Sequence, residues 1–116
     1  MIELASEISA VWEARDDIES LMPRDKARDL VREAVSMLDR GEVRVAEVVD
    51  DVVVVHEWLK QAILLCFRLE DLATVELGPF EFHDRLPLKR DFAAAKVRVL
   101  PGASARWGSS LAPGGT

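Results

Sequence analysis

The stretch ARDLVREAVSMLDRGEVRVAEVVDDVVVVHEWLKQAILLCFRL, residues 27–69, changes its hydrophobic period twice. Apolar residues first recur every three or four positions up to Gly41, which is the pattern of an amphipathic helix that ends in a glycine cap. Two valine-rich runs then flank Asp50-Asp51 and predict a hairpin. From Trp58 to Leu69 the helical spacing returns, with apolar residues on most of the circumference, so this third helix is expected to be the central buried element.

The residues before this stretch predict one more helix. Apolar side chains from Ile2 to about Leu21 follow helical spacing, and Pro23 interrupts the pattern because proline lacks the amide hydrogen that a continuing helix needs. The expected fold class is therefore α+β, a small domain of about three helices with short antiparallel strands.

The chain after Leu72 carries weaker signals, and its composition shifts toward proline and glycine. The elements expected there are strands at 74–77, 80–82 and 97–100 and one helical turn at 93–95. We expect a domain at 1–102 and a tail at 103–116, which is rich in Gly, Ser, Ala and Pro. The tail is expected to be mobile, with Trp107 and Leu111 exposed.

Composition and charge exclude several classes of protein. A chain of 116 residues holds one modest core, and its net charge of −6 argues against a general nucleic-acid binder, which neutralises phosphates with basic side chains. The apolar runs 52–55 and 62–67 are far shorter than the ~20 residues of a membrane span. A single cysteine forms no internal disulfide. The acidic N-terminus predicts no signal peptide, so the expected location is the cytoplasm.

Charge is unevenly distributed along the chain. Residues 1–76 hold 9 basic and 18 acidic side chains, a net of −9, whereas residues 77–116 hold 6 basic and 3 acidic side chains, a net of +3. A basic second half suits a small anionic ligand. A solvated loop region has the same composition, so charge alone leaves both interpretations open.

Residue types that often carry chemistry have structural interpretations here. His56 lies at the start of the third helix and His83 lies in a polar turn, and neither has the spacing of a metal site. Cys66 stands in an apolar run, where a free cysteine behaves as a small buried hydrophobe. We therefore predict no catalytic residue, no metal ligand and no bound cofactor in this chain.

Arg98 is the candidate binding residue. In the predicted strand its side chain lies on the face opposite Val97 and Val99, and the planar guanidinium of arginine suits a carboxylate or phosphate through two hydrogen bonds. Four other basic residues accompany it: Lys89, Arg90, Lys96 and Arg106. Charged residues are also common on the open side of a strand, which leaves a purely structural role open.

The tail contains one further pattern. Leu111-Ala112-Pro113-Gly114 has the form of one turn of a hexapeptide-repeat, left-handed β-helix, and Ala105 lies one period earlier. A solenoid buries its core only by stacking turns, so one turn is not stable alone. We expect the chain to stop at the start of such a β-helix, with the β-helix itself absent.

Four blocks of the sequence carry a family likeness in the same order. They are 38–47 (LDRGEVRVAE), 56–68 (HEWLKQAILLCFR), 86–89 (LPLK) and 97–101 (VRVLP). Together they resemble the N-terminal domain of the tetrahydrodipicolinate N-succinyltransferase family. The resemblance covers the chain from about residue 25 to its end.

This resemblance implies a cytoplasmic bacterial enzyme of the diaminopimelate branch of lysine biosynthesis. Members move a succinyl group from the cosubstrate succinyl-CoA to the amine of L-2-amino-6-oxopimelate, and three subunits associate through a left-handed β-helix. Arg98 matches the family's substrate-binding arginine, and a guanidinium suits the dicarboxylate acceptor. The other functional residues belong to the β-helix, so these residues alone are predicted to have no succinyltransferase activity.

Two other functions fit the same residues. One is a free-standing, non-catalytic interaction module that binds or modulates a complete succinyltransferase. The other is an unrelated anion-binding domain that uses the basic second half. Dicarboxylate binding through Arg98 and complex formation with a complete relative would distinguish the three.

Overall fold

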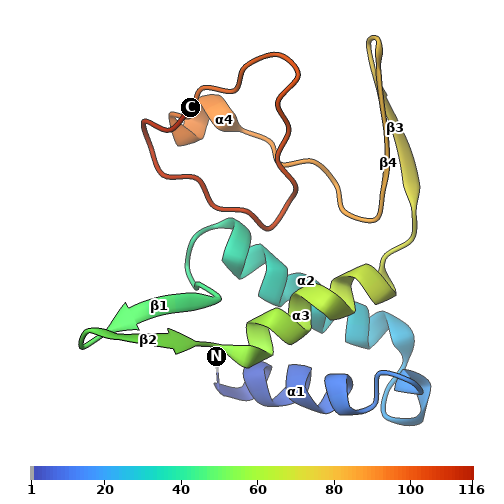
Figure 1. The fold of residues 1–116 in the computed structure, drawn as a ribbon. Coiled ribbons are helices and arrows are strands. Elements are labelled where there is room, and N and C mark those ends of the chain that lie inside the picture. The colour runs from blue at the N-terminus through green and yellow to red at the C-terminus, as the bar shows by residue number, and fades with distance from the viewer. Residues whose placement is uncertain (1) are drawn as a thin grey trace.

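The computed structural model describes residues 2–116, and Met1, the first residue of the expected domain, lies outside the described residues. Three long helices form the body: α1 (Ile2–Glu13), α2 (Arg24–Asp39) and α3 (Glu57–Leu69). Two antiparallel hairpins extend from it (Figure 1): β1 (Ala46–Val49) with β2 (Val52–Val55), and β3 (Ala73–Leu77) with β4 (Phe80–Asp84). The short helices are η1 (Ile18–Ser20) and α4 (Phe92–Ala95). The predicted α+β class is confirmed.

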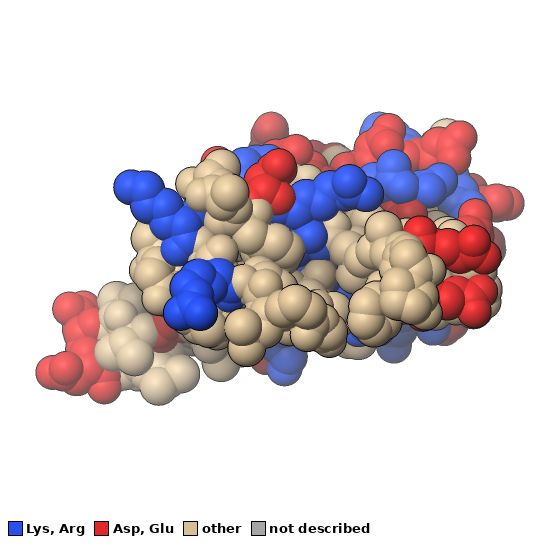
Figure 2. All heavy atoms as spheres, turned by 90° about the horizontal axis from the view of Figure 1, so that it is seen from above, with Lys and Arg blue, Asp and Glu red and all other residues tan. Residues whose placement is uncertain are grey.

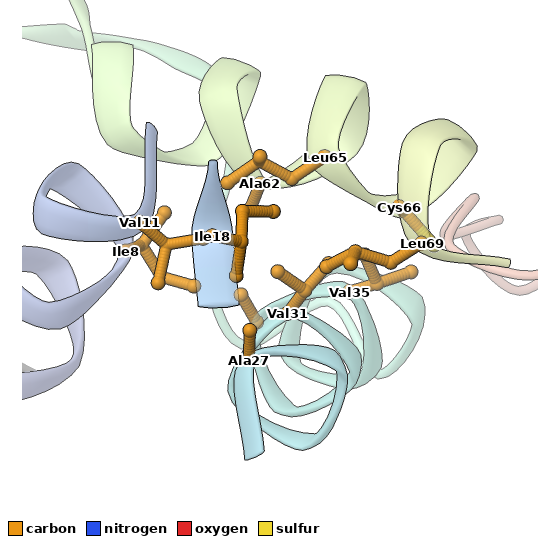
Figure 3. Packing of buried hydrophobic residues seen from close by; sticks show 11 residues of the cluster. Ile8, Val11, Ile18, Ala27, Val31, Val35, Ala62, Leu65, Cys66 and Leu69 are labelled. Atoms are coloured by element: carbon orange, nitrogen blue, oxygen red, sulfur yellow. The ribbon is translucent and has the colours of Figure 1, made fainter. Parts of the chain in front are cut away.

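The hydrophobic core lies among the three long helices, and α3 is its central element (Figure 3). α3 packs against both α1 and α2, as its apolar pattern predicts. Leu65 has no exposed surface, and Ile8, Val31 and Val35 belong to the same buried cluster. One face of α3 is open, because Leu64 is 54% exposed, so the helix is less enclosed than its composition predicts.

The end of α2 has the glycine cap that the sequence predicts. Gly41 has a φ of +75°, a left-handed conformation that glycine adopts without the steric cost of a β-carbon. The amide of Gly41 donates to the Leu38 carbonyl at 3.1 Å, and the amide of Glu42 donates to the Met37 carbonyl at 3.0 Å. This is the hydrogen-bond pattern of a Schellman motif, which satisfies the last helical carbonyls.

The first helix is shorter than the predicted helix at 2–21, and that prediction is wrong in its second half. α1 ends at Glu13, the chain turns, and η1 begins at Ile18. Arg15 falls where the apolar stripe of a continuous helix would need its next residue, so continuing the helix would bury no further apolar surface there. The turn instead returns Ile18 to the core, where it is 7% exposed.

The valine-rich hairpin forms as predicted, with its turn at Asp50-Asp51. The two aspartates have φ values of 50° and 62°, the left-handed values of a type I′ turn, although the turn lacks glycine. The opposing Val48 and Val53 are 70% and 66% exposed. The hairpin projects from the helices in Figure 1 and adds little to the core.

The later elements match the sequence only in part. The second hairpin and the helical turn are present as β3–β4 and α4, but the predicted strand at 97–100 is wrong. Its backbone hydrogen bonds are not those of a strand: the Val97 amide donates to the Phe92 carbonyl at 3.0 Å, and the Leu100 carbonyl accepts from the Ala103 amide at 2.9 Å, both within local turns. The Arg98 amide donates to the Gly115 carbonyl at 3.0 Å. Four residues of alternating pattern cannot show whether a neighbouring strand exists to pair with them.

The segment 103–116 runs back over the end of α2. The expectation that Trp107 is exposed is wrong, because its indole packs against the core cluster and is partly buried. The Trp107 amide also donates to the Pro87 carbonyl at 2.9 Å. The expectation for Leu111 is confirmed, since it is 40% exposed. A large aromatic side chain thus anchors a segment whose composition alone predicts a loose tail.

Candidate functional site

Arg98 lies in a loop between α4 and the C-terminal residues. Its side chain is exposed, and its backbone is held by the hydrogen bond to Gly115. Lys96 has a left-handed φ of 60°, so the chain turns sharply just before Arg98. After this turn, Arg98 lines a cleft in the C-terminal region.

The cleft beside Arg98 has a volume of about 630 Å³ and mainly apolar walls. Phe92 contributes from α4, Leu100 from the loop, and Leu111 and Pro113 from the C-terminal segment. Within residues 2–116, Arg98 is the one lining residue with an ionisable side chain. A single cation next to apolar walls suits a small ligand with an aliphatic chain and a carboxylate or phosphate group.

The basic residues of the second half separate into paired and unpaired groups. The ion pairs are Lys89 with Asp39 at 2.8 Å and Arg106 with Asp84 at 2.7 Å. No ion pair forms in the described part of the chain for Arg90, Lys96 or Arg98. Figure 2 shows the molecule from above relative to Figure 1. Uncharged surface fills much of the middle of this view, and Lys and Arg side chains cross it. Arg98 thus lines the cleft without an ion pair to an aspartate or glutamate side chain of residues 2–116.

A larger cleft of about 720 Å³ lies between β3–β4 and the helical body, and its arginines are occupied. Glu70 is 6% exposed and accepts two hydrogen bonds from each of Arg28 and Arg32. Arg85 donates to the Glu70 carbonyl at 2.8 Å. The hydrogen bonds from Arg32 and then Arg28 lower the pKa of the Glu70 carboxyl to about 2. This cluster fastens α2 to the end of α3, so the Arg98 cleft is the better candidate for a ligand.

Sequence reasoning missed a carboxylate beside His56. Its Nε2 lies 3.1 Å from Oε1 of Glu47, which projects from the neighbouring strand β1. The register of the predicted hairpin could have indicated this pair, because Glu47 opposes Val54 and His56 follows two residues later on the same face. His83 lies 2.9 Å from the Thr74 hydroxyl across β3–β4. The His83 contact joins opposite positions of β3 and β4, so the expected place of His83 in a turn is wrong. His56 lies just after β2, at the start of α3.

Neither histidine contributes to the Arg98 cleft. Among residues 2–116, no three or more His, Cys, Asp or Glu side chains are arranged to hold a metal ion.

Cys66 lies in the core, as predicted, with 1% of its surface exposed. Burial raises the pKa of its thiol to about 11, so the thiol stays protonated near neutral pH. We expect Ellman's reagent to modify the native protein at least about 100-fold more slowly than the urea-unfolded protein, measured by absorbance. Equal rates for native and unfolded protein would contradict this placement.

Comparison with known proteins identifies the family. A sequence model described as "Tetrahydrodipicolinate N-succinyltransferase N-terminal" matches residues 3–69, more than half of the chain. The chain belongs to the tetrahydrodipicolinate N-succinyltransferase family. The 2,3,4,5-tetrahydropyridine-2,6-dicarboxylate N-succinyltransferase of Bordetella pertussis is 38% identical to it over 96% of this chain. The protein of the same name from Burkholderia mallei is 42% identical over 95% of this chain.

The chain corresponds to the N-terminal domain of the tetrahydrodipicolinate N-succinyltransferases and spans less than half the length of these relatives. It covers 43% of the Bordetella protein and 42% of the Burkholderia protein. The match at 3–69 comprises the helical body and the first hairpin, and Arg98 lies outside that stretch. None of the helices described here is long and apolar enough to cross a membrane.

Proposed function

We propose that this chain forms the part of a tetrahydrodipicolinate N-succinyltransferase that binds the acceptor, with Arg98 holding one carboxylate of that dicarboxylate. The supporting observation is that Arg98, an exposed residue with no ion pair within residues 2–116, is among the residues that line an apolar cleft. L-2-amino-6-oxopimelate has an aliphatic chain for the cleft and a carboxylate for two hydrogen bonds. The pathway would be the diaminopimelate branch of lysine biosynthesis in the cytoplasm.

The rest of the reaction requires groups that this cleft does not supply. Transfer from succinyl-CoA needs an oriented amine, a base and stabilisation of the developing oxyanion. His56, His83 and Cys66 are not among the residues that line the cleft. We infer that the remaining length of the family members, a β-helix that joins three subunits according to the family resemblance, supplies these groups and the contacts to succinyl-CoA.

Titration with pimelate, followed by NMR chemical shifts, tests the Arg98 clamp. We expect Arg98→Ala to weaken pimelate binding by about 10- to 100-fold, because a charge-assisted, two-point contact is lost. Arg90→Ala is the matched control, since Arg90 is also exposed and unpaired within residues 2–116 but does not line the cleft. Equal affinity in the parent and Arg98→Ala would remove the clamp from the proposal.

A second measurement tests whether this chain lacks the groups needed for succinyl transfer. These 116 residues are expected to release no CoA from succinyl-CoA in the presence of an acceptor dicarboxylate with an α-amine. Thiol release is read with a chromogenic reagent, and the matching blank omits the protein. Turnover above that blank would show that the chain carries the transfer chemistry itself.

A further inference from the structure

The loop that carries Arg98 is closed at its neck by a short antiparallel ladder. The Lys89 amide donates to the Ala105 carbonyl and the Trp107 amide donates to the Pro87 carbonyl, each at 2.9 Å. Leu88 and Arg106 form a β-bridge between these two bonds. The residues at 90–104, Arg98 among them, extend from this neck, so the position of the neck sets the position of the loop.

Asp39, the last residue of α2, binds both sides of this neck. Its Oδ1 accepts a hydrogen bond from Nζ of Lys89 at 2.8 Å and another from the amide of Gly108 at 2.9 Å. Its backbone carbonyl accepts a second bond from Lys89 at 3.2 Å. One residue therefore holds the chain where it enters the loop and again just after it leaves.

The charges of Asp39 and Lys89 compensate each other in a partly buried ion pair. The side chain of Lys89 is 9% exposed and that of Asp39 is 24% exposed, so water screens the pair only weakly. A carboxylate at the C-terminus of a helix faces the negative end of the helix dipole, and the ammonium of Lys89 offsets that repulsion. Removing either partner leaves a shielded charge without compensation.

Close packing also fixes the chain after the neck. Gly108 has a φ of +104°, and a β-carbon at this position would lie 3.0 Å from Cγ1 of Val35 on α2. The chain then continues to Gly115, whose carbonyl accepts the hydrogen bond from the Arg98 amide. Release of Gly108 from α2 would therefore loosen the segment that holds the Arg98 backbone.

We propose that Asp39 and Lys89 are positioning residues for Arg98. Their ion pair, together with the Gly108 amide, fastens the loop to α2 and keeps the guanidinium at the cleft. Neither side chain lines the cleft, so both act through Arg98 and do not touch the ligand. The expected effect on ligand binding rests on the proposed function, whereas the expected effect on the loop backbone does not.

The variants separate charge, acceptor and packing. Asp39→Ala removes the carboxylate and the acceptor for Gly108, and Asp39→Asn removes only the charge. Gly108→Ala keeps both side chains of the ion pair but introduces a β-carbon that clashes with Cγ1 of Val35 at 3.0 Å. The matched control is Asp16→Asn, which breaks the exposed ion pair with Arg68 at a site distant in sequence from the loop.

Amide hydrogen exchange measures how firmly the backbone of the Arg98 loop is held. The amide of Leu65, a buried residue of α3, is the internal reference for global folding. We expect Asp39→Ala and Gly108→Ala each to speed exchange at the Arg98 amide by about tenfold or more, with Asp39→Asn intermediate, Asp16→Asn without effect and the Leu65 amide unchanged. Unchanged exchange at the Arg98 amide in both Asp39→Ala and Gly108→Ala would overturn the proposal.

Pimelate titration provides the functional readout. Asp39→Ala is expected to weaken binding by about fivefold or more in the parent but to cause no further loss in an Arg98→Ala background, because the effect passes through Arg98. An equal loss in both backgrounds would show a general structural role and would overturn the positioning proposal. If the parent itself binds no pimelate, the proposed function fails, and amide exchange still decides whether Asp39 holds the loop.

Discussion

Leu65→Ala is expected to lower the free energy of unfolding by roughly 3 kcal/mol, since it removes buried methyl groups and leaves a cavity. Leu65 has no exposed surface and belongs to the cluster where α3 meets the other two long helices. A domain of this size has a total stability of about 5–15 kcal/mol, so this one change removes a large share of it. Urea unfolding followed by far-UV circular dichroism measures the loss.

The neighbouring Leu64 provides a matched control. It has the same side chain on the same helix but is 54% exposed, so Leu64→Ala removes little buried surface. We expect it to change the free energy of unfolding by less than about 1 kcal/mol. Equal losses for the two variants would contradict the arrangement in which α3 is the central helix with one face open.

The helical body was predictable because each of its signals is local. The apolar spacing and Gly41 predict α2 and its end, and the two valine runs around Asp50-Asp51 predict the first hairpin. The end of α1 was not predicted, because the same apolar residues fit either a long helix or a shorter helix followed by a turn that returns Ile18 to the core. Only the packing of the other helices separates these two arrangements.

The sequence singled out Arg98 as the candidate binding residue, but it did not predict the geometry around it. The family resemblance and the chemistry of arginine both pointed to Arg98, yet the strand expected around it does not form. The segments before and after the Arg98 loop are held by contacts between distant positions, such as Asp39 with Gly108 and Trp107 with the core. A pattern within a few residues carries no information about such partners, since they are set by how the chain folds back.

Glu70→Gln is expected to lower the free energy of unfolding at pH 7 by roughly 2–3 kcal/mol. The pKa of the Glu70 carboxyl falls from 4.5 to about 2 in the folded chain, chiefly through the hydrogen bond from Arg32 and then that from Arg28. The loss in unfolding free energy is smaller than the full pKa shift implies, because the guanidiniums of Arg32 and Arg28 are 46% and 34% exposed and water screens them. Glutamine also points an amide donor at groups that can only donate.

Glu70→Gln also predicts how the stabilisation by the Glu70 carboxylate depends on pH. Because the folded pKa lies below the unfolded one, the carboxylate stabilises the folded state fully above the unfolded value of 4.5 and loses this effect as pH falls toward about 2. The difference in unfolding free energy between the parent and Glu70→Gln should therefore shrink by more than half between about pH 7 and about pH 3. A difference that stays constant would contradict the assignment.

Glu42→Gln is the control for this pH dependence. The pKa of Glu42 is also lowered by a hydrogen-bonded arginine, Arg40, but both side chains are about half exposed. Solvent screening should make its effect much smaller than that of Glu70→Gln at every pH. A large effect only at Glu70 would show that this buried carboxylate, held by two arginines, stabilises the fold more than the exposed pair of Glu42 with Arg40. It would also explain how the segment after α3 is held where the chain turns into β3.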